Sequence, residues 1–467
     1  MFLKLSLFLV ASLSTNSWAN QDVYPFKYTP EVLEKNWMKV RVEGQKSSYL
    51  RNPFRFVGYS IKAFKKKFTG PQEAITHFEK TRQTFDELAE MKPEGESVRL
   101  SFVGDLMWLR TGWSGFLDDR LKKHFENSDF LFGNLETLIS KSHKVPTFPP
   151  ARATFNSPPS IIDEFKSQGG KNLFSALSVA NNHSLDYGEL GFKETLEVLN
   201  SRKIPFSGVL DNAFESSKKR WVLIEKSGLK VGFYAATYGM NNRWEKESKV
   251  DFNLLKGFAP LYEESKVDLK EIEGVLQEMK EASVDIKIIS LHWGFEYEYY
   301  PEAKQVIVAR EIVKKGADII MGHHSHSQQP LDLCFVNGKE KGLKSYNFKS
   351  ACTLKGEGRP RKALIIYGLG NFLTNMYGFL SEVGTVLDVY FIQNEEGYWD
   401  WHSPKVHLVY NERDYKNGEG EDPRTLLFMA DYLAQNCFKK ACPKDELFAL
   451  KFLEILYPKS SFSLKLP

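Results

Sequence analysis

From residue 98 onward, short apolar stretches alternate with segments whose apolar positions recur at helical spacing. Short apolar runs are typical of buried strands, and an apolar period of 3.6 residues is typical of helices that cover a sheet. The alternation predicts an α/β fold with a layered sheet core covered by helices. The predicted strands are 98–103, 129–132, 173–180, 286–291, 318–321 and 363–367, the predicted helices are 190–202, 269–281 and 304–315, and a hairpin is predicted around Ser227-Gly228.

The same pattern predicts one large domain with an addition at each end, without internal repeats or low-complexity tracts. The parts are an N-terminal extension (20–97), a main domain (98–390) with an inserted loop rich in Lys and Gly (331–361), and C-terminal strands and helices (391–467). Further helices are predicted at 71–91 and near 423–438 and 444–456.

Residues 1–19 have the pattern of a signal peptide. Lys4 precedes a mostly apolar run at 5–13, and Ser17-Trp18-Ala19 places small residues on both sides of Trp18. We therefore expect cleavage after Ala19 and a mature protein that is periplasmic or secreted. The apolar run is too short to span a bilayer. No later segment is long and apolar enough either, so we expect no transmembrane segment after signal removal.

Four cysteines suit an oxidising compartment: Cys334, Cys352, Cys437 and Cys442. An even number in an exported chain favours disulfides, and four cysteines allow three pairings. Of these we favour the local pairs Cys334–Cys352 and Cys437–Cys442. A zinc site is the alternative, although the four lack the Cys-x2-Cys spacing that is typical of such sites.

Charge argues against a nucleic-acid-binding protein. The 467 residues include 63 Lys and Arg and 59 Asp and Glu, which gives a net charge of +4. No basic block dominates, and we interpret the run Lys65-Lys66-Lys67 as a solvated face. Hydrophobic residues make up 42% and charged residues 26% of the chain, so a globular core of ordinary size is expected.

Polar groups that can bind a metal follow five of the predicted strands. In an open α/β sheet, the carboxyl ends of the strands are where ligands bind. Each group alone has a simpler explanation, such as a helix N-cap for Asp105 or a core histidine for His292. Together, these carboxylate, amide and imidazole groups indicate one or two divalent ions, Mn, Fe or Zn. The groups are Asp105, Glu136, Asn182-His183, His292 and His323-His324-Ser325-His326.

Two of these segments resemble motifs of 5′-nucleotidase-type calcineurin-like phosphoesterases. The stretch from Asn182 to Gly188 is similar to their GNHE-x-D-Y-G block, and Gly322 to His326 is similar to their strand that ends in G-H-x-H. The combination of motifs over about residues 98–390 more closely resembles the CapA family of bacterial capsule synthesis proteins. Its signatures here are Val103-Gly104-Asp105, Gly133-Asn134-Leu135-Glu136-Thr137, Ala180-Asn181-Asn182-His183, His292-Trp293-Gly294 with Glu296-Tyr297, Pro301 and Gln305, Gly316-Ala317-Asp318, the His cluster with Gln329-Pro330, and Leu369-Gly370-Asn371-Phe372.

The resemblance implies a metallophosphoesterase-like core and a role for each motif residue. The implied metal ligands are Asp105, Glu136, Asn182, His292, His324 and His326. His183 would donate a proton to the leaving group as a general acid, and Asp186 would orient it. We further expect Asn134, His323 and Asn371 to contact the substrate.

Two positions depart from the phosphoesterase pattern, and the CapA family shares both departures. Met107 stands where the D-x-H motif has its histidine, and Glu136 replaces the bridging aspartate. One metal position has therefore lost an imidazole, which leaves the number of ions open. Two ions about 4 Å apart could share a hydroxide and support in-line displacement at phosphorus.

Three functions fit these motifs. The first is a metal-dependent hydrolase of a phosphoester or of an amide in an anionic polymer; the resemblance implies a link to capsule or poly-γ-glutamate synthesis or export, with envelope export machinery as a partner. The second is a non-catalytic polymer-binding or assembly factor that keeps a structural metal site. The third, a small-molecule 5′-nucleotidase, would need a second domain to stack a base, and residues 391–467 look too small for that.

Overall fold

The computed structural model describes most of the predicted main domain and parts of both additions. The predicted signal peptide and the predicted pair Cys437–Cys442 lie outside the described residues. Among the described residues, no helix combines the length and the apolar character needed to cross a bilayer. The described residues are 72–90, 95–107, 115–146, 154–241, 248–258, 267–338, 352–376, 378–402, 404–413, 424–436, 450 and 453–459.

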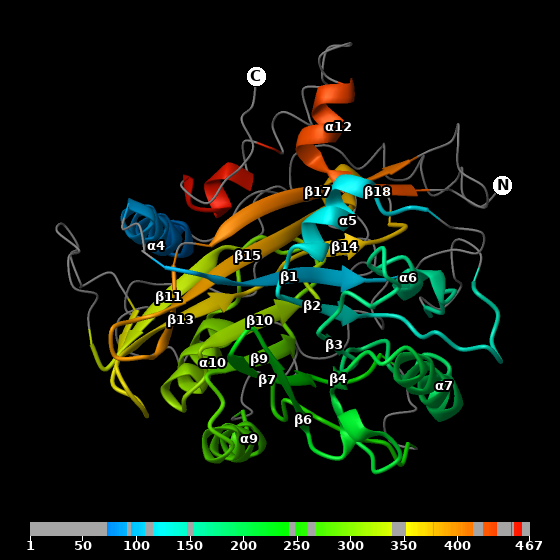
Figure 1. Ribbon diagram of the computed structural model, residues 1–467, viewed down its shortest axis with the longest axis horizontal. Helices are drawn as coiled ribbons and strands as arrows, with labels where there is room; N and C mark the ends of the chain where they lie inside the picture. Colours follow the sequence, from blue (N-terminus) through cyan, green and yellow to red (C-terminus); the bar gives the residue numbers. More distant parts are fainter. Residues whose placement is uncertain are drawn as a thin grey trace, which may run out of the picture.

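Two large mixed sheets form the centre of the described structure (Figure 1). The first, of nine strands, has the order β18 (Arg424–Phe428), β17 (Lys405–Arg413), β15 (Val383–Gln393), β1 (Val98–Leu106), β2 (Phe130–Leu135), β3 (Ala176–Ser178) and β4 (Phe206–Ser207), with β14 (Asn371–Leu373) beside β1 and β16 (Trp399–Trp401) beside β15. The second, of seven strands, has the order β12 (Cys352–Leu354), β11 (Leu331–Val336), β13 (Arg361–Ile366), β10 (Ile319–His323), β9 (Ile286–His292), β7 (Leu229–Thr237) and β6 (Trp221–Lys226). A separate two-stranded sheet pairs β5 (Val209–Leu210) with β8 (Asp251–Phe252).

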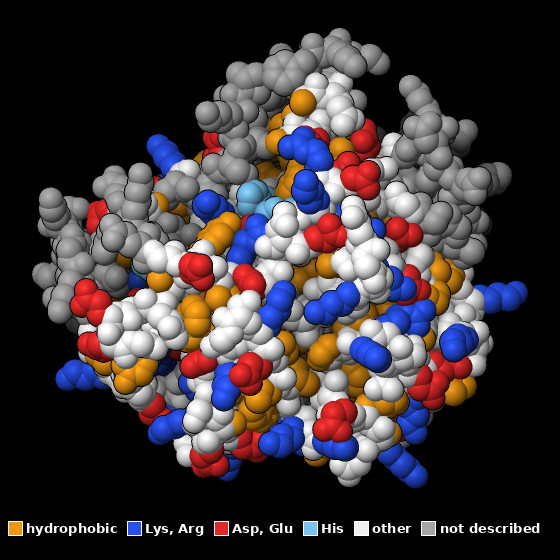
Figure 2. Space-filling model, viewed as in Figure 1, with side chains coloured by type: hydrophobic (Ala, Val, Ile, Leu, Met, Phe, Trp, Pro, Cys, Tyr) orange, Lys and Arg blue, Asp and Glu red, His pale blue; other side chains and the backbone are white. Residues whose placement is uncertain are grey.

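Helices cover the outer faces of both large sheets. Leu121 and Phe125 of α5 (Asp119–Glu126) and Leu196 of α7 (Gly188–Ser201) pack in one apolar cluster with Val103 of β1. On the second sheet, α9 (Lys270–Glu281) and α10 (Ala303–Lys314) bury their apolar stripes in the main core. The predicted layered sheet core covered by helices is confirmed. On the face drawn in Figure 2, Lys and Arg alternate with Asp and Glu, and no block of one sign covers it.

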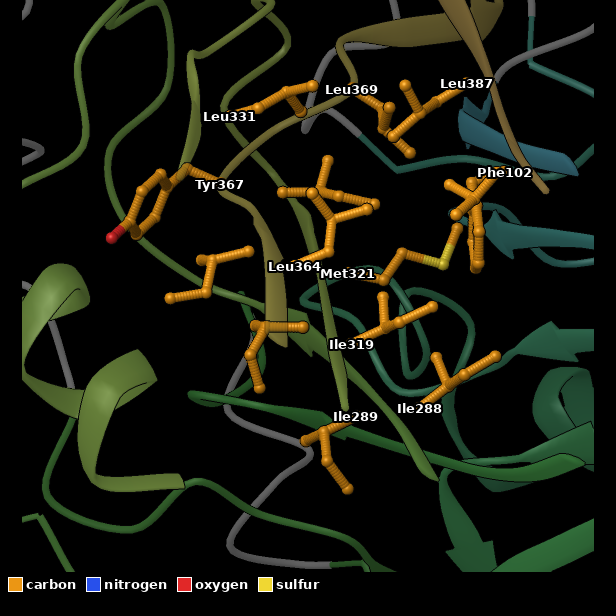
Figure 3. Close-up of a cluster of buried hydrophobic side chains, with 14 of the residues drawn as sticks. Phe102, Ile288, Ile289, Ile319, Met321, Leu331, Leu364, Tyr367, Leu369 and Leu387 are labelled. Atoms are coloured by element: carbon orange, nitrogen blue, oxygen red, sulfur yellow. The ribbon is translucent and has the colours of Figure 1, made fainter. Parts of the chain in front are cut away.

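The main core fills the space between the two sheets and continues across the second sheet to α9 and α10. Strands present alternate residues to opposite faces, so Phe102 of β1 points into this core while its neighbour Val103 points toward the helices. Figure 3 shows Phe102 and Leu387 of the first sheet opposite Met321 of the second. Because both inner faces are apolar, the sheets bury each other, and their carboxyl ends are held in a fixed relation.

The N-terminal extension packs on this core. Phe78 and Phe85 of α4 (Gln72–Glu90) belong to the main apolar cluster. Beside them, the buried Asp332 of β11 accepts a hydrogen bond from the Tyr367 hydroxyl at 3.1 Å and lies 3.3 Å from Nε2 of His77. The helix predicted at 71–91 is thus present and is part of the fold.

Two predictions for the second half of the chain were wrong. The segment 331–361 contains β11 and β12, which extend the seven-stranded sheet, instead of a loop alone. Its Lys-rich and Gly-rich middle obscured the buried run at Leu331–Val336. The helix expected near 423–438 begins only at Met429, because the preceding residues form β18 at the sheet edge.

The predicted disulfide between Cys334 and Cys352 is confirmed, and it links the neighbouring strands β11 and β12. The bond closes a loop with a sequence separation of 18 residues. Cross-linking a loop of this size restricts the unfolded chain and stabilises the folded state by roughly 2–4 kcal/mol. We expect the double variant Cys334→Ser/Cys352→Ser to lose about that much stability in urea unfolding, with a somewhat larger m-value because its unfolded chain is less compact. A midpoint equal to that of the oxidised wild type would contradict this.

Candidate metal and catalytic site

The five predicted strand ends meet at one edge of the two sheets. In the first sheet, β1, β2 and β3 run parallel, so Asp105, Glu136 and Asn182 follow one another across that edge. In the second sheet, β9 and β10 run parallel and end side by side, with His292 paired to His323. The two sets face each other because the sheets share one core. The sequence therefore places these side chains correctly at a common edge.

Two glycines of the motifs allow the close approach of backbones behind this edge. A Cβ atom on Gly104 would lie 1.9 Å from the carbonyl oxygen of Gly370, and one on Gly322 would lie 1.9 Å from that of Tyr367. The loop after β10 then turns sharply, since His324 and His326 have φ angles of 85° and 47°. Such backbone conformations are uncommon for residues other than glycine and concentrate at functional sites.

Four of the predicted ligands form a first group. The Asn182 side-chain oxygen lies 2.8 Å from Nε2 of His292, and that nitrogen lies 3.5 Å from Oε1 of Glu136. Donor atoms of Glu136, His292 and His324 all lie within 4.8 Å of one another. An amide oxygen, a carboxylate and two imidazoles converging in this way match the donor set of a Mn, Fe or Zn site.

A second group shares Glu136 with the first. Donor atoms of Asp105, Glu136 and His326 lie within 4.8 Å of one another, with His326 Nδ1 3.7 Å from the Asp105 carboxylate. Glu136 therefore stands between two sets of donors, as a carboxylate that bridges two ions would. The structure thus brings together all six residues that the sequence proposed as ligands.

The buried carboxylate of Glu136 shows that these donors fit a cation. Its side chain is fully buried, and neither oxygen accepts a hydrogen bond from any described residue. Burial raises the pKa of Glu136 well above its ordinary value, and the charge of Asp105 raises it further. An orphaned carboxylate of this kind is costly unless a cation or a proton neutralises it.

The neighbouring groups are poised to coordinate at neutral pH. Burial would raise the pKa of Asp105, but the hydrogen bond and charge of His323 outweigh it and lower that pKa. Burial lowers the pKa of His324 to about 3 and that of His292 well below its ordinary value, and neighbouring imidazoles add to both effects. These imidazoles are therefore neutral at pH 7, with a lone pair free for a metal.

The predicted acid His183 lies beside this cluster, held from three sides. Its Nδ1 is 2.7 Å from Oδ2 of Asp186, which fixes the ring as the sequence predicted. Phe155 packs on the ring with a centroid distance of 4.1 Å, and the Asn241 amide lies 3.3 Å from Nε2. That same Nε2 faces Oε1 of Glu136 at 3.9 Å. Phe155 and Asn241 belong to none of the motifs, so their contacts with His183 could not be predicted from the sequence.

The three residues expected to contact substrate lie behind the proposed ligands. The Asn134 amide donates to Asp105 at 2.9 Å, and His323 Nδ1 lies 2.9 Å from the same carboxylate oxygen. The Asn371 side-chain oxygen lies 2.9 Å from Nδ1 of His326. All three are buried. Their observed contacts orient Asp105 and His326, and such partners fix the geometry of metal ligands.

Met107 and Glu296 complete the comparison with the phosphoesterase pattern. Met107 occupies the position of the missing histidine, is buried, and packs with Phe155 and Met376 in a small apolar cluster.

Glu296, which belongs to a motif but had no predicted role, has a carboxylate oxygen within 4.8 Å of ring nitrogens of His324 and His326. Burial raises its pKa to about 7. Its position beside these histidines could not be predicted from the sequence, because Glu296 follows β9 whereas His324 and His326 follow β10.

The solved structures to which the chain shows similarity include two nucleotidases. A putative 5′-nucleotidase from Staphylococcus aureus is 16% identical at a TM-score of 0.38, over 69% of this chain and 56% of its own. The NAD nucleotidase of Haemophilus influenzae is 14% identical at a TM-score of 0.36, over 79% of this chain and 57% of its own.

Sequence relatives include two capsule proteins. Capsule biosynthesis protein CapA of Bacillus anthracis is 25% identical over 258 residues, which cover 51% of this chain and 57% of the relative. PGA biosynthesis protein CapA of Bacillus subtilis (strain 168) is 28% identical over 242 residues, which cover 50% and 58%. The chain thus spans under two thirds of these relatives. The family model of the bacterial capsule synthesis protein PGA_cap matches residues 99–376, more than half of the chain, and the chain belongs to this family.

Proposed function

We propose that this protein is a metal-dependent hydrolase that acts outside the cytoplasm on a phosphoester or on an amide bond of an anionic envelope polymer. The observation that carries the proposal is the buried, unpartnered carboxylate of Glu136 between two sets of donors, with His183 beside it. A purely structural ion needs the donors alone, whereas hydrolysis also needs a proton donor next to them.

The chain's own residues would hold divalent ions in two adjoining positions. Glu136, Asn182, His292 and His324 would hold one, and Asp105, Glu136, His326 and Glu296 would border the other. When bound, the ions would supply Lewis-acid activation of the bond to be cleaved and of water. Asn134, His323 and Asn371 would keep Asp105 and His326 in place through the hydrogen bonds they already make.

His183 would deliver the proton that the leaving group needs. The bond from its Nδ1 to the carboxylate of Asp186 selects the tautomer and stabilises the charged ring. Its Nε2 faces the proposed ligands and would hold the proton to be donated. The ring of Phe155, which packs on the imidazole at a tilt of 34°, would exclude water from one side of it and limit its rotation.

The second candidate is a polymer-binding or assembly factor in which the ion is structural. It is favoured by Met107, because an apolar cluster replaces one expected ligand. Under both candidates we propose an anionic capsule polymer, of the poly-γ-glutamate kind, as substrate or ligand, and envelope export machinery as a partner. Family membership and the names of the two capsule relatives support this choice.

A substrate screen tests the proposed function directly. The purified mature chain, supplied with Mn²⁺, Zn²⁺ or Fe²⁺, is incubated with a panel of phosphoesters and with γ-glutamyl polymers. We expect turnover of one of the two substrate classes with at least one of the ions. Binding of a polymer without any turnover by the metal-loaded protein would favour the assembly factor instead.

The role of Glu296 predicts a pH dependence of metal affinity. Burial raises the pKa of Glu296 to about 7, and this carboxyl must lose its proton before it can coordinate. Affinity should therefore fall as the pH drops below 7, by up to about tenfold per pH unit for one displaced proton. In Glu296→Gln, binding at pH 8 should weaken and the fall between pH 7 and 6 should become shallower, because only the proton on Glu136, whose pKa is also raised, is then left to be displaced.

Isothermal titration calorimetry in buffers of different ionisation enthalpy measures both the affinity and the protons released. Glu395→Gln is the matched control, because Glu395 is exposed in the turn between β15 and β16. It should titrate like wild type. A Glu296→Gln variant with the affinity and pH profile of wild type would remove Glu296 from the metal site.

A further inference from the structure

A second group of metal-binding side chains lies away from the candidate site. It consists of His124 in the last turn of α5, Asp388 in β15 and His407 in β17. Asp388 pairs with Ser101, which precedes Asp105 in β1 by four residues, or about 13 Å along the strand. The group lies on the outer face of the first sheet, under α5.

Both imidazoles direct the same nitrogen toward one carboxylate oxygen. Nε2 of His124 lies 3.0 Å from Oδ2 of Asp388, and Nε2 of His407 lies 3.2 Å from that oxygen. The three donor atoms lie within 4.8 Å of one another. Ligand atoms around a tetrahedral ion with bonds of about 2.0–2.1 Å are separated by roughly 3.3 Å, so a small displacement would admit the ion.

The hydrogen bonding of these groups is incomplete without an ion. His124 Nε2 is buried and makes no hydrogen bond with a described residue, because its ring is not aligned with the carboxylate despite the short distance. The other oxygen of Asp388 accepts from the Ser101 hydroxyl at 2.6 Å. Such a contact holds a carboxylate in place as a metal ligand and leaves Oδ2 for the ion.

The charges around the group permit a cation. Asp388 is fully buried, and its negative charge faces two imidazoles that are neutral or positive according to pH. The other cation nearby is Arg99, 3.8 Å from Oδ2, whose guanidinium donates to the backbone carbonyl of His124 at 2.6 Å. This contact directs Arg99 to the helix end. A dication bound by neutral imidazoles would complete the neutralisation of Asp388.

Solvent can reach the group from one side. The side chains of His124 and His407 are 14% and 19% exposed, so a water could complete a tetrahedral shell. Because Nε2 of His124 and the carboxylate of Asp388 are themselves buried, an ion would enter through a movement of the two exposed ring edges.

We propose that His124, Asp388 and His407 bind a transition-metal ion such as Zn²⁺, which joins α5 to β15 and β17. Two imidazoles, one carboxylate and a water are a common zinc donor set. The family match ends at residue 376, so Asp388 and His407 belong to the strands beyond it, whereas His124 lies inside it. The ion would therefore fasten the C-terminal strands to the helix layer of the matched region. This proposal does not depend on the proposed function.

The test is the zinc content of the chain without a polyhistidine tag, after Zn²⁺ loading and dialysis. His124→Gln and His407→Gln should each bind one Zn²⁺ per chain fewer than wild type, or bind it at least about tenfold more weakly. Both glutamines keep the size and a polar end, so the fold should be retained, as circular dichroism would show. His402→Ala, outside both groups, should keep the wild-type content.

A second measurement separates this ion from those of the candidate active site. In the background Glu136→Gln/His292→Ala, which removes the carboxylate shared by both donor groups of the candidate site, one Zn²⁺ should remain, and adding His407→Gln should remove it. Co²⁺ in the same background should give the visible absorption of a tetrahedral site. Unchanged zinc content in both glutamine variants, or no zinc in the background variant, would overturn the proposal and leave an ion-paired cluster of two histidines and one aspartate.

Discussion

Replacement of His183 by alanine is expected to slow hydrolysis by roughly 10²–10⁴-fold, the usual contribution of a general acid. Metal content should stay at the wild-type value, since His183 is not among the six proposed ligands. The fold should be retained with a lower melting temperature, because the variant leaves a cavity beside Phe155 and removes the imidazole partner of the buried Asp186. The imidazole is held by Asp186 at 2.7 Å and points its other nitrogen at the ligand cluster. Rates measured at saturating substrate, with elemental analysis of the same samples, check this.

Asp186→Asn and His402→Ala are the matched controls for His183→Ala. Asp186→Asn keeps the shape but weakens the orientation of the ring, so its loss of rate should be intermediate; His402→Ala should have no effect. If the protein is only an assembly factor, the imidazole of His183 takes no part in its function. A folded, metal-loaded His183→Ala protein that fully restores the capsule phenotype of a deletion strain would end the catalytic interpretation.

Glu136→Gln should abolish tight metal binding while leaving the metal-free fold intact. This carboxylate belongs to both donor groups, so its loss should weaken binding by at least the roughly 10–100-fold seen for less direct changes. The metal-free variant should be as stable as metal-free wild type or more so, because glutamine removes a buried carboxylate without a partner. Titration calorimetry and thermal unfolding with a chelator measure the two effects.

The difference in stability between metal-free wild type and Glu136→Gln should depend on pH in a direction that the pKa of Glu136 determines. The pKa of Glu136 is raised in the folded state from its ordinary value of 4.5, so its ionisation costs stability as the pH rises above that value. The stability advantage of Glu136→Gln over metal-free wild type should therefore grow from acid to neutral pH. Retention of the ion by the variant, or a loss of metal-free stability that grows with pH, would argue against a shared ligand.

The fold and the convergence of the six proposed ligands could be predicted, because each of these residues follows an apolar run of the sequence. Such a run indicates a buried strand, and parallel strands place the residues that follow them at one edge. Asp105 and His292 were found in this way although they are far apart in the sequence. Their burial and the orphaned state of Glu136 could not be predicted, because both depend on how the two sheets stack.

Other features had no local signal. Glu296 approaches His324 and His326 only because the loop after β10 turns through positive φ angles. Asp388 meets His407 as a diagonal neighbour across two antiparallel strands, and meets His124 through helix packing. The loop predicted at 331–361 was wrong because the many Lys and Gly residues in its middle outweighed the short apolar run that forms the buried strand β11. Tertiary pairing decided each of these cases.

The most direct test of the proposed function is the turnover rate of wild-type protein as a function of bound ion. Protein is stripped with a chelator and titrated with Mn²⁺, Zn²⁺ or Fe²⁺, and hydrolysis of the substrate identified in the screen is measured at each occupancy. We predict no turnover without the ion and a rate that rises in proportion to occupancy of the site at Glu136. A rate independent of occupancy, or no turnover by the fully loaded protein, would contradict the proposed hydrolase.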